Sequence, residues 1–159
     1  MSTEVRTKTV TVFGSSLPLP GEKQYEDAYR LGYLLGASGY NVCSGGNAGI
    51  MEAVSKGVTE GGEMAIGVTF HHFTVTPNQY LSQVVETNSL FERIQKLIEF
   101  GDAYVILQGG TGTLLEFSAV WELINKGLIT HKPVVTHSPL WEQIVSPMEK
   151  QIEFENRET

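Results

Sequence analysis

Strand and helix signals alternate along this chain of 159 residues, and that alternation constrains the fold more than any other feature. Short apolar, β-branched segments each precede a longer segment with apolar residues at helical spacing. The predicted strands are 9–13, 40–43, 65–69, 82–86 (a short edge strand), 103–107 and 133–136, and the predicted helices are 22–37, 48–56, 90–100, 113–126 and one that begins at 138–139. Strands joined by right-handed helical crossovers pair in parallel. We therefore predict an α/β, Rossmann-like, doubly wound fold, with a mostly parallel sheet and helices on both faces.

The composition is typical of a globular protein, and we expect residues 1–159 to form a single domain. Hydrophobic residues make up 41% of the chain and charged residues 18%. The net charge of −7 argues against nucleic acid or an anionic membrane surface as a partner. We find no apolar run long enough to span a membrane and no apolar signal segment before Thr9. The single cysteine, Cys43, excludes an internal disulfide and is typical of a reducing compartment, so we expect a cytoplasmic protein.

Three loops are predicted at the carboxyl ends of strands, where sheets of this type bind their ligands. Two of them, 44–49 and 108–113, are rich in glycine and lead into helices. Glycine lets the backbone approach a ligand, and a helix N-terminus adds about half a positive charge, so such loops favour phosphate. The candidate phosphate- or nucleotide-binding residues are Gly14, Ser15, Ser16, Gly45, Gly46, Asn47, Gly109, Gly110, Thr111, Gly112 and Thr113. The alternative is that these glycines only form tight turns.

Neither glycine loop matches a complete nucleotide-binding fingerprint. No Gly-Lys-Ser/Thr follows, which excludes a Walker A loop, and residues 110–115 lack the third glycine of the dinucleotide motif. The histidine and cysteine spacings typical of zinc sites are also missing. We therefore predict a Rossmann-like nucleotide-binding domain whose partner is a small nucleotide or phosphorylated ligand, with no metal and no cofactor.

Arg93 and Glu116 are the candidate catalytic residues. Glu116 lies just after the second glycine loop, where a carboxylate could stabilise charge or activate water. The segment 113–116 also matches a capping box, so a purely structural role for Glu116 stays open. The planar guanidinium of Arg93 suits phosphate or a carboxylate. The alternative for Arg93 is a solvated surface side chain.

Several other residues are assigned to packing or to the surface. Cys43 ends an apolar strand and is expected to be a small core residue. Trp121 and Trp141 lie on predicted helices and are expected to pack rather than to stack on a ligand. The adjacent pair 71–72, both histidines, falls in a predicted loop and is expected at the surface.

Four segments resemble, in the same order, motifs of the "Lonely Guy" family of cytokinin-activating phosphoribohydrolases. Residues 109–116 (GGTGTLLE) are similar to the family signature G-G-x-G-T-x-x-E, and residues 44–51 to its other glycine loop. Residues 90–93 resemble its Met-His-x-Arg segment, and residues 12–16 its first strand and loop. The resemblance covers roughly residues 9–136.

The chain departs from the family pattern at three positions close to these motifs. Gln108 stands where the pattern has proline, Phe91 where it has histidine, and Ile94 where it has lysine. Many relatives carry the label "possible lysine decarboxylase", but nothing in the chain resembles a pyridoxal-phosphate enzyme.

The resemblance implies a function and a site. It implies a Rossmann-like homodimer, or a higher homo-oligomer, that hydrolyses the N-glycosidic bond of a nucleoside 5′-monophosphate to a free base and ribose 5-phosphate. It places Arg93 and Glu116 at the catalytic pair and residues 110–113 at the phosphate site. Short relatives include molybdenum cofactor carrier proteins, so a binding or carrier protein without turnover is the alternative.

Overall fold

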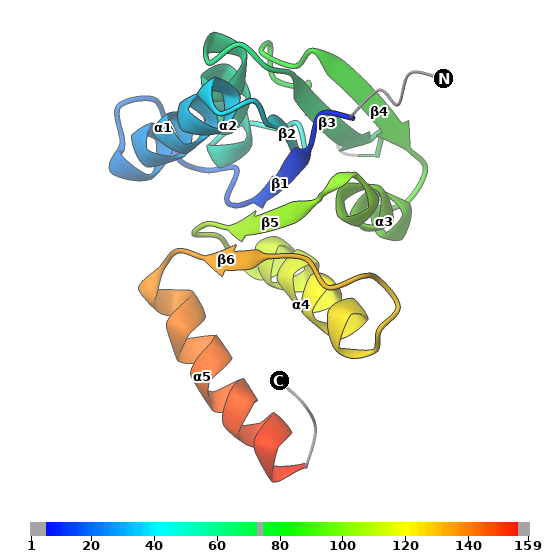
Figure 1. Ribbon diagram of the computed structural model, residues 1–159. Helices are drawn as coiled ribbons and strands as arrows, with labels where there is room; N and C mark the ends of the chain where they lie inside the picture. The colour runs from blue at the N-terminus through cyan, green and yellow to red at the C-terminus, as the bar shows by residue number, and fades with distance from the viewer. Residues whose placement is uncertain (1–5, 73–74, 156–159) are drawn as a thin grey trace.

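Six parallel strands form one sheet in the part of the chain described by the computed structural model, residues 6–72 and 75–155 (Figure 1). Their order is β4-β3-β2-β1-β5-β6. The strands are β1 (Thr9–Phe13), β2 (Asn41–Ser44), β3 (Ala65–Phe70), β4 (Gln83–Thr87), β5 (Ala103–Ile106) and β6 (Val134–Thr136). The helices are α1 (Lys23–Ala37), α2 (Ile50–Glu60), α3 (Leu90–Phe100), α4 (Thr111–Asn125) and α5 (Pro139–Phe154). The predicted α/β, Rossmann-like fold is confirmed, and β4 is the predicted edge strand.

The helices cover both faces of this sheet (Figure 1). On one face, Val12 of β1 packs in a cluster with Ala28 of α1 and Val54 of α2. On the other face, Phe13 of the same strand packs with Leu97 of α3 and with buried residues of α4 and α5. Consecutive side chains of a strand point to opposite faces, so β1 contributes to both clusters. No helix within the described residues is long and apolar enough to cross a membrane.

Glycines let α1 and α2 approach each other backbone to backbone. A Cβ at Gly32 would lie 2.4 Å from the carbonyl oxygen of Val54, and one at Gly57 would lie 2.1 Å from that of Tyr29. Gly32 and Gly57 therefore allow close packing of the two helices. The predicted end of the second helix at residue 56 is wrong, because α2 continues to Glu60 and uses Gly57 as a contact with α1.

Polar caps begin α3 and α5. The Ser89 hydroxyl oxygen accepts a hydrogen bond from the Glu92 N–H at 3.1 Å. In return, the Glu92 carboxylate accepts from the Asn88 N–H at 2.8 Å. At α5, the Ser138 hydroxyl oxygen accepts from the Leu140 N–H at 3.2 Å, and proline follows the cap.

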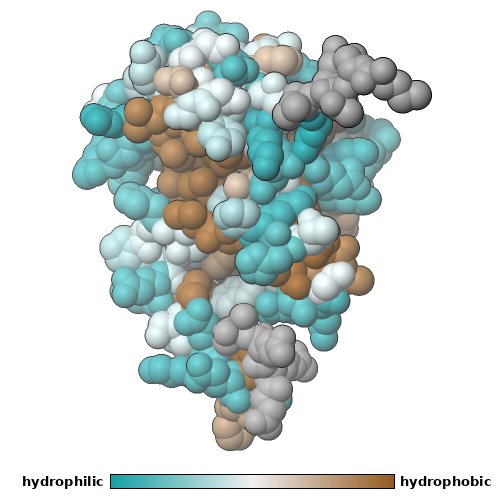
Figure 2. Space-filling model, viewed as in Figure 1, coloured by the Kyte–Doolittle hydropathy of each residue, from teal (hydrophilic) through white to brown (hydrophobic). Residues whose placement is uncertain are grey.

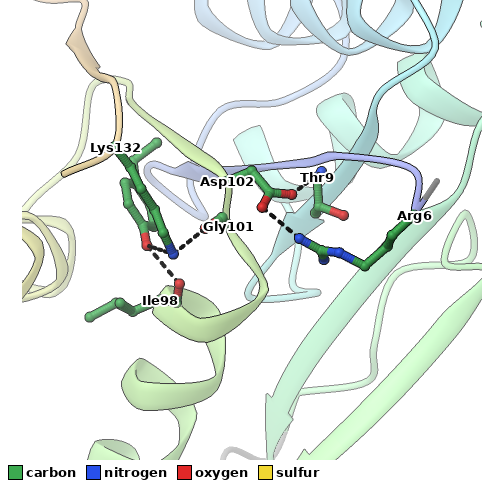
Figure 3. Close-up of polar contacts among 7 residues, drawn as sticks. Arg6, Thr9, Ile98, Gly101, Asp102 and Lys132 are labelled. Atoms are coloured by element: carbon green, nitrogen blue, oxygen red, sulfur yellow. Dashed lines mark hydrogen bonds and ion pairs between the residues drawn. The ribbon is translucent and has the colours of Figure 1, made fainter. Parts of the chain in front are cut away.

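Asp102 ties the start of β1 to the start of β5 at the amino edge of the sheet (Figure 3). Its carboxylate accepts from the Thr9 N–H at 2.9 Å and from the Arg6 guanidinium at 2.5 Å.

Lys132 closes the same edge next to β6 (Figure 3). Its ammonium donates to the Gly101 carbonyl at 2.8 Å and to the Tyr104 hydroxyl at 3.4 Å. The Tyr104 hydroxyl in turn donates to the Ile98 carbonyl at 2.6 Å. Burial, with a smaller contribution from Asp102, raises the pKa of Tyr104 to about 12, so the phenol stays neutral. These contacts stabilise the amino edge, whereas the candidate site residues follow the strands at the carboxyl edge.

Candidate active site

Arg93 is a buried side chain that links the ends of two strands. It lies on α3 and is only 5% exposed. Its Nε donates to the Val68 carbonyl of β3 at 2.9 Å, and its Nη2 donates to the Gly45 carbonyl, just after β2, at 3.0 Å. A solvated surface arginine, the alternative considered from the sequence, is therefore excluded. Charge-assisted bonds to backbone carbonyls hold the guanidinium in one orientation.

Gly45 makes room for this arginine. A Cβ at residue 45 would lie 1.9 Å from Nη2 of Arg93. Real Cβ atoms essentially never come this close to another heavy atom. The glycine is therefore explained by a residue of α3 that lies 48 positions later in the chain.

Glu116 lies in the second turn of α4. The helix begins at Thr111, two residues earlier than predicted, and its N-cap is Gly110 with no side-chain cap bond. The predicted capping box of Thr113 and Glu116 is therefore wrong. Thr113 is instead only 4% exposed and packs inward. The structural alternative for Glu116, a helix cap, is removed by this shift of the helix start.

The environment of Glu116 raises its pKa to about 7, because burial penalises the carboxylate. The positive charge of Arg93 acts in the opposite direction and lowers the pKa. Burial likewise lowers the pKa of Arg93, while Glu116 and, more weakly, Cys43 oppose that change. The thiol of Cys43 is fully buried, and burial raises its pKa to about 12, so it remains neutral. A carboxyl group with a pKa near neutrality is suited to general acid–base chemistry.

The start of α4 leaves open space around Gly110 and Gly112. A Cβ at either residue would meet nothing within 4 Å, and neither residue has a positive φ. Packing within the protein therefore does not account for glycine at these two positions. Thr111 between them is exposed, and the first N–H groups of a helix have no partner within it. This N-terminus, which we call the α4 cradle (residues 110–112), has the geometry of an anion site.

Gly109 and Thr113 are in close contact on either side of the α4 cradle. A Cβ at Gly109 would lie 2.1 Å from Oγ1 of Thr113. Since Thr113 is buried, this pair fixes the end of the loop after β5 against the first turn of the helix.

Ser15 connects the loop after β1 to two neighbouring loops. Its N–H donates to the Gln108 carbonyl and its carbonyl accepts from the Ile50 N–H, both at 2.9 Å. Its hydroxyl oxygen accepts from the Leu17 N–H at 3.1 Å. A Cβ at Gly14 would lie 2.7 Å from the Ile50 side chain. Ser16 is exposed, so in this loop it is the predicted residue that faces solvent most fully.

The loop after β2 is held by Asn78, which the sequence analysis missed. The Asn78 N–H donates to the Gly46 carbonyl at 2.8 Å, and its side-chain amide donates to the Asn47 carbonyl at 3.0 Å. Gly46 and Gly49 have positive φ values of 74° and 67°. Contacts and backbone conformation within the protein thus account for the glycines of this loop, in contrast to those of the α4 cradle. Nothing in the sequence marks Asn78, because its partners lie about 30 residues away.

Three other predictions concerned packing and surface residues. Trp141 is only 1% exposed, and its indole N–H donates to the Leu107 carbonyl at 2.9 Å. The ring of Trp121 stacks on Phe117 at a centroid distance of 5.4 Å. Both tryptophans therefore pack as expected, and Cys43 is a core residue. The histidines at 71 and 72 are exposed, as predicted.

Fold and site together define a Rossmann-like α/β protein with a buried arginine, a half-buried glutamate and an open helix N-terminus at the same edge of its sheet. A model of the SLOG cluster4 family matches residues 7–157, and the chain belongs to this family. The predicted resemblance to Lonely Guy proteins is thereby confirmed.

Curated relatives are named as phosphoribohydrolases. The chain is 30% identical over 132 residues to the cytokinin riboside 5′-monophosphate phosphoribohydrolase of Rhodococcoides fascians, covering 80% of this chain and 66% of that protein. It is 36% identical over 138 residues to a probable enzyme of the same name, LOGL3, from Oryza sativa subsp. japonica, covering 82% and 63%. The chain thus spans slightly less than two thirds of these relatives.

This chain matches a larger share of one solved structure than of the curated relatives. The molybdenum cofactor binding protein of Rippkaea orientalis superposes with a TM-score of 0.75 at 22% identity, covering 92% of this chain and 87% of that one. At this identity the similarity establishes the shared fold.

Proposed function

We propose that this protein is a phosphoribohydrolase that hydrolyses the N-glycosidic bond of a nucleoside 5′-monophosphate, releasing the base and ribose 5-phosphate. The observation that carries the proposal is the buried Arg93, whose charge acts on the half-buried Glu116, at the same sheet edge as the α4 cradle. The names of the curated relatives support the same activity.

The α4 cradle holds the 5′-phosphate in this proposal. The unpaired N–H groups and the dipole of the helix N-terminus attract the anion, and the missing Cβ atoms of Gly110 and Gly112 let it approach the backbone. The phosphate is remote from the bond that breaks, so its binding energy can position the ribose. Ser16 and Thr111 add hydroxyl groups, and the loop residues Gly14, Ser15, Gly45, Gly46, Asn47, Gly109 and Thr113 shape the site.

Glu116 is the proposed catalytic carboxylate. As the C1′–N bond breaks, positive charge develops on the ribose ring, and a fixed carboxylate stabilises that charge. Glu116 takes a proton from the water whose oxygen bonds to C1′. The base leaves with the electron pair of the broken bond and takes up that proton. Arg93 is a positioning residue, because it donates hydrogen bonds to the Val68 and Gly45 carbonyls while its charge acts on Glu116.

The test is a panel of nucleoside 5′-monophosphates scored for release of ribose 5-phosphate. Loss of a general acid–base group typically lowers the rate by about 10²–10⁴-fold, so Glu116→Gln should lower release by that factor. Glu122→Gln, on the exposed side of α4, is the matched control and should keep full activity. Full activity in a folded Glu116→Gln protein would remove Glu116 from the mechanism.

The alternative is a protein that binds a nucleotide or phosphorylated cofactor without turnover. The molybdenum cofactor binding protein of Rippkaea orientalis, which shares this fold, supports the alternative by its name. This reading predicts saturable binding without product, and binding that survives Glu116→Gln.

We further infer a cytoplasmic homodimer or higher homo-oligomer built from single nucleotide-binding domains. Figure 2 shows an apolar band that runs from α1 towards β6, where no helix covers the sheet in the view of Figure 1. Both elements carry exposed apolar side chains, among them Leu34 of α1 at 52% and Val135 of β6 at 56%. A second copy packed on the apolar band would remove apolar surface from water. Light scattering should give at least twice the chain mass of 17.5 kDa, and a monomer would contradict this inference.

A further inference from the structure

A cavity lies at the carboxyl edge of the sheet, on the side of α1. It has a volume of about 220 Å³, and we call it the glutamine pocket. Gln24 of α1, Gln108 after β5 and His137 after β6 supply polar walls, and Ile50, Leu107 and Pro139 supply apolar ones. Neither Arg93 nor Glu116 lines it. Pockets that enclose a whole drug-sized ligand usually measure roughly 300–1,000 Å³, so this one fits part of a ligand.

The glutamine pocket and the candidate catalytic residues lie towards different faces of the sheet. Gln24 of α1 and Ile50 of α2 line the pocket together with residues after β5 and β6, and α1 and α2 cover one face. Arg93 and Glu116 belong to α3 and α4, which cover the other face. The loop after β5 supplies Leu107 and Gln108 to the pocket and leads into the α4 cradle, so with the ribose towards Glu116 the pocket is left for a group attached to the phosphate.

The two glutamines offer a matched pair of hydrogen-bonding groups. The Gln24 amide donates to the Gln108 side-chain carbonyl at 3.3 Å. This contact uses one N–H of Gln24 and the carbonyl of Gln108, so the Gln108 amide N–H groups and the Gln24 carbonyl can serve as donors and acceptor for a ligand. Lys23 also lines the pocket, but its ammonium pairs with Asp27 at 2.5 Å, and both charges belong to the same wall. The lining therefore favours an uncharged, hydrogen-bonding group in the pocket over a charged one.

Gln108 gives this pocket a polar side chain that the Lonely Guy pattern does not have at this position. It stands where the Lonely Guy pattern has proline, and proline has no side-chain donor or acceptor. Gln108 also lies two residues before Gly110, so the pocket adjoins the α4 cradle along the same loop.

We propose that the glutamine pocket binds an uncharged sugar that is joined through a second phosphate to the 5′-phosphate of the ligand, so that the preferred ligand is a sugar ester of a nucleoside diphosphate rather than a free monophosphate. This inference rests on the proposed function for the place of the phosphate and of the ribose. It extends that function by naming the substrate class, a nucleoside diphosphate sugar.

Calorimetric titration of matched ligand sets tests the proposal. The probes are AMP, ADP and ADP-ribose, then UMP, UDP and UDP-glucose, then GMP, GDP and GDP-mannose, and the diphosphates separate the effect of the sugar from that of the second phosphate. Two additional hydrogen bonds correspond to roughly tenfold in affinity, so at least one ester should bind about ten times more tightly than its monophosphate and its diphosphate. In Gln24→Leu and Gln108→Leu this preference should disappear while the affinity for the monophosphate is unchanged. Gln143→Leu, an exposed glutamine of α5, is the matched control and should keep the preference.

The outcomes separate the two proposals. If the monophosphates bind and no ester binds more tightly, the pocket inference is overturned and the proposed function stands. The same holds if the preference persists in both glutamine variants. If no nucleotide of either kind binds, both proposals are overturned. Thermal unfolding confirms that each variant is folded, which is expected because Gln24 and Gln108 are exposed.

Discussion

Replacing Gly45 by alanine tests whether Arg93 sets the protonation of Glu116. The new Cβ would lie 1.9 Å from Nη2 of Arg93. Ordinary contacts between such atoms begin near 3.4 Å, so the guanidinium has to move by about 1.5 Å. That movement breaks the 3.0 Å bond from Nη2 to the Gly45 carbonyl. Loss of a hydrogen bond to a charged group costs about 1.5–3 kcal/mol of folding free energy.

The displaced charge also changes the titration of Glu116. Arg93 lowers the pKa of Glu116 while burial raises it to about 7, so moving the arginine away raises the pKa further. Of the charged groups, Arg93 is the one that acts on this carboxyl, since Cys43 is neutral at these pH values. Hydrolysis that needs the carboxylate then declines at a higher pH. The acid limb of the pH profile of kcat/KM should therefore move in the alkaline direction.

Two assays measure this effect. Carbon NMR of the glutamate carboxyl groups gives the pKa of Glu116 whether or not the protein hydrolyses a substrate. Release of ribose 5-phosphate at different pH values gives the pH profile of kcat/KM. Gly112→Ala is the control, because its Cβ would meet nothing within 4 Å. It should leave the Glu116 pKa unchanged while weakening phosphate binding in the α4 cradle. An unchanged carboxyl pKa in Gly45→Ala would refute the reasoning.

Three further predictions concern stability. The folded-state pKa of Glu116, about 7, lies above its unfolded value of about 4.3, so its contribution is complete below pH 4 and is lost as the pH rises through 7. The free energy of unfolding of Glu116→Gln, relative to that of the wild type, should therefore rise by about 3 kcal/mol from pH 4 to pH 8. Urea denaturation measures this difference, and a difference that is the same at both pH values would contradict the prediction. Gly57→Ala should lower the free energy of unfolding, measured with urea, by about 1–3 kcal/mol, because the new Cβ meets the Tyr29 carbonyl at 2.1 Å. Alanine has the better helix propensity, so a stabilised variant would contradict the packing argument. Lys132→Met should lower the melting temperature, because it removes hydrogen bonds to the Gly101 carbonyl and the Tyr104 hydroxyl that are each worth about 1 kcal/mol. It should not change the rate of ribose 5-phosphate release, since these groups lie at the amino edge of the sheet.

The order of strands and helices is predictable from the sequence because it depends on local patterns. Residues 9–13 and 103–107 are apolar enough for buried strands, and caps such as Ser89 and Ser138 act within three residues. Parallel pairing follows from the alternation alone. The helix ends are less predictable. Gly57 continues α2 because α1 packs against it, a contact across about 25 residues that no local pattern reveals.

The sequence by itself determined the fold class, the family and which glycine-rich loops to inspect. Only the tertiary structure decided what each glycine and each charge does, because that depends on which atoms a missing or present side chain faces. Gly45 faces Arg93 from another helix, whereas Gly110 and Gly112 face open space. Glu116 could not be told from a helix cap until the start of α4 and the burial of Arg93 were known. These contacts join residues that are far apart in the chain, so they exist only once the sheet has formed.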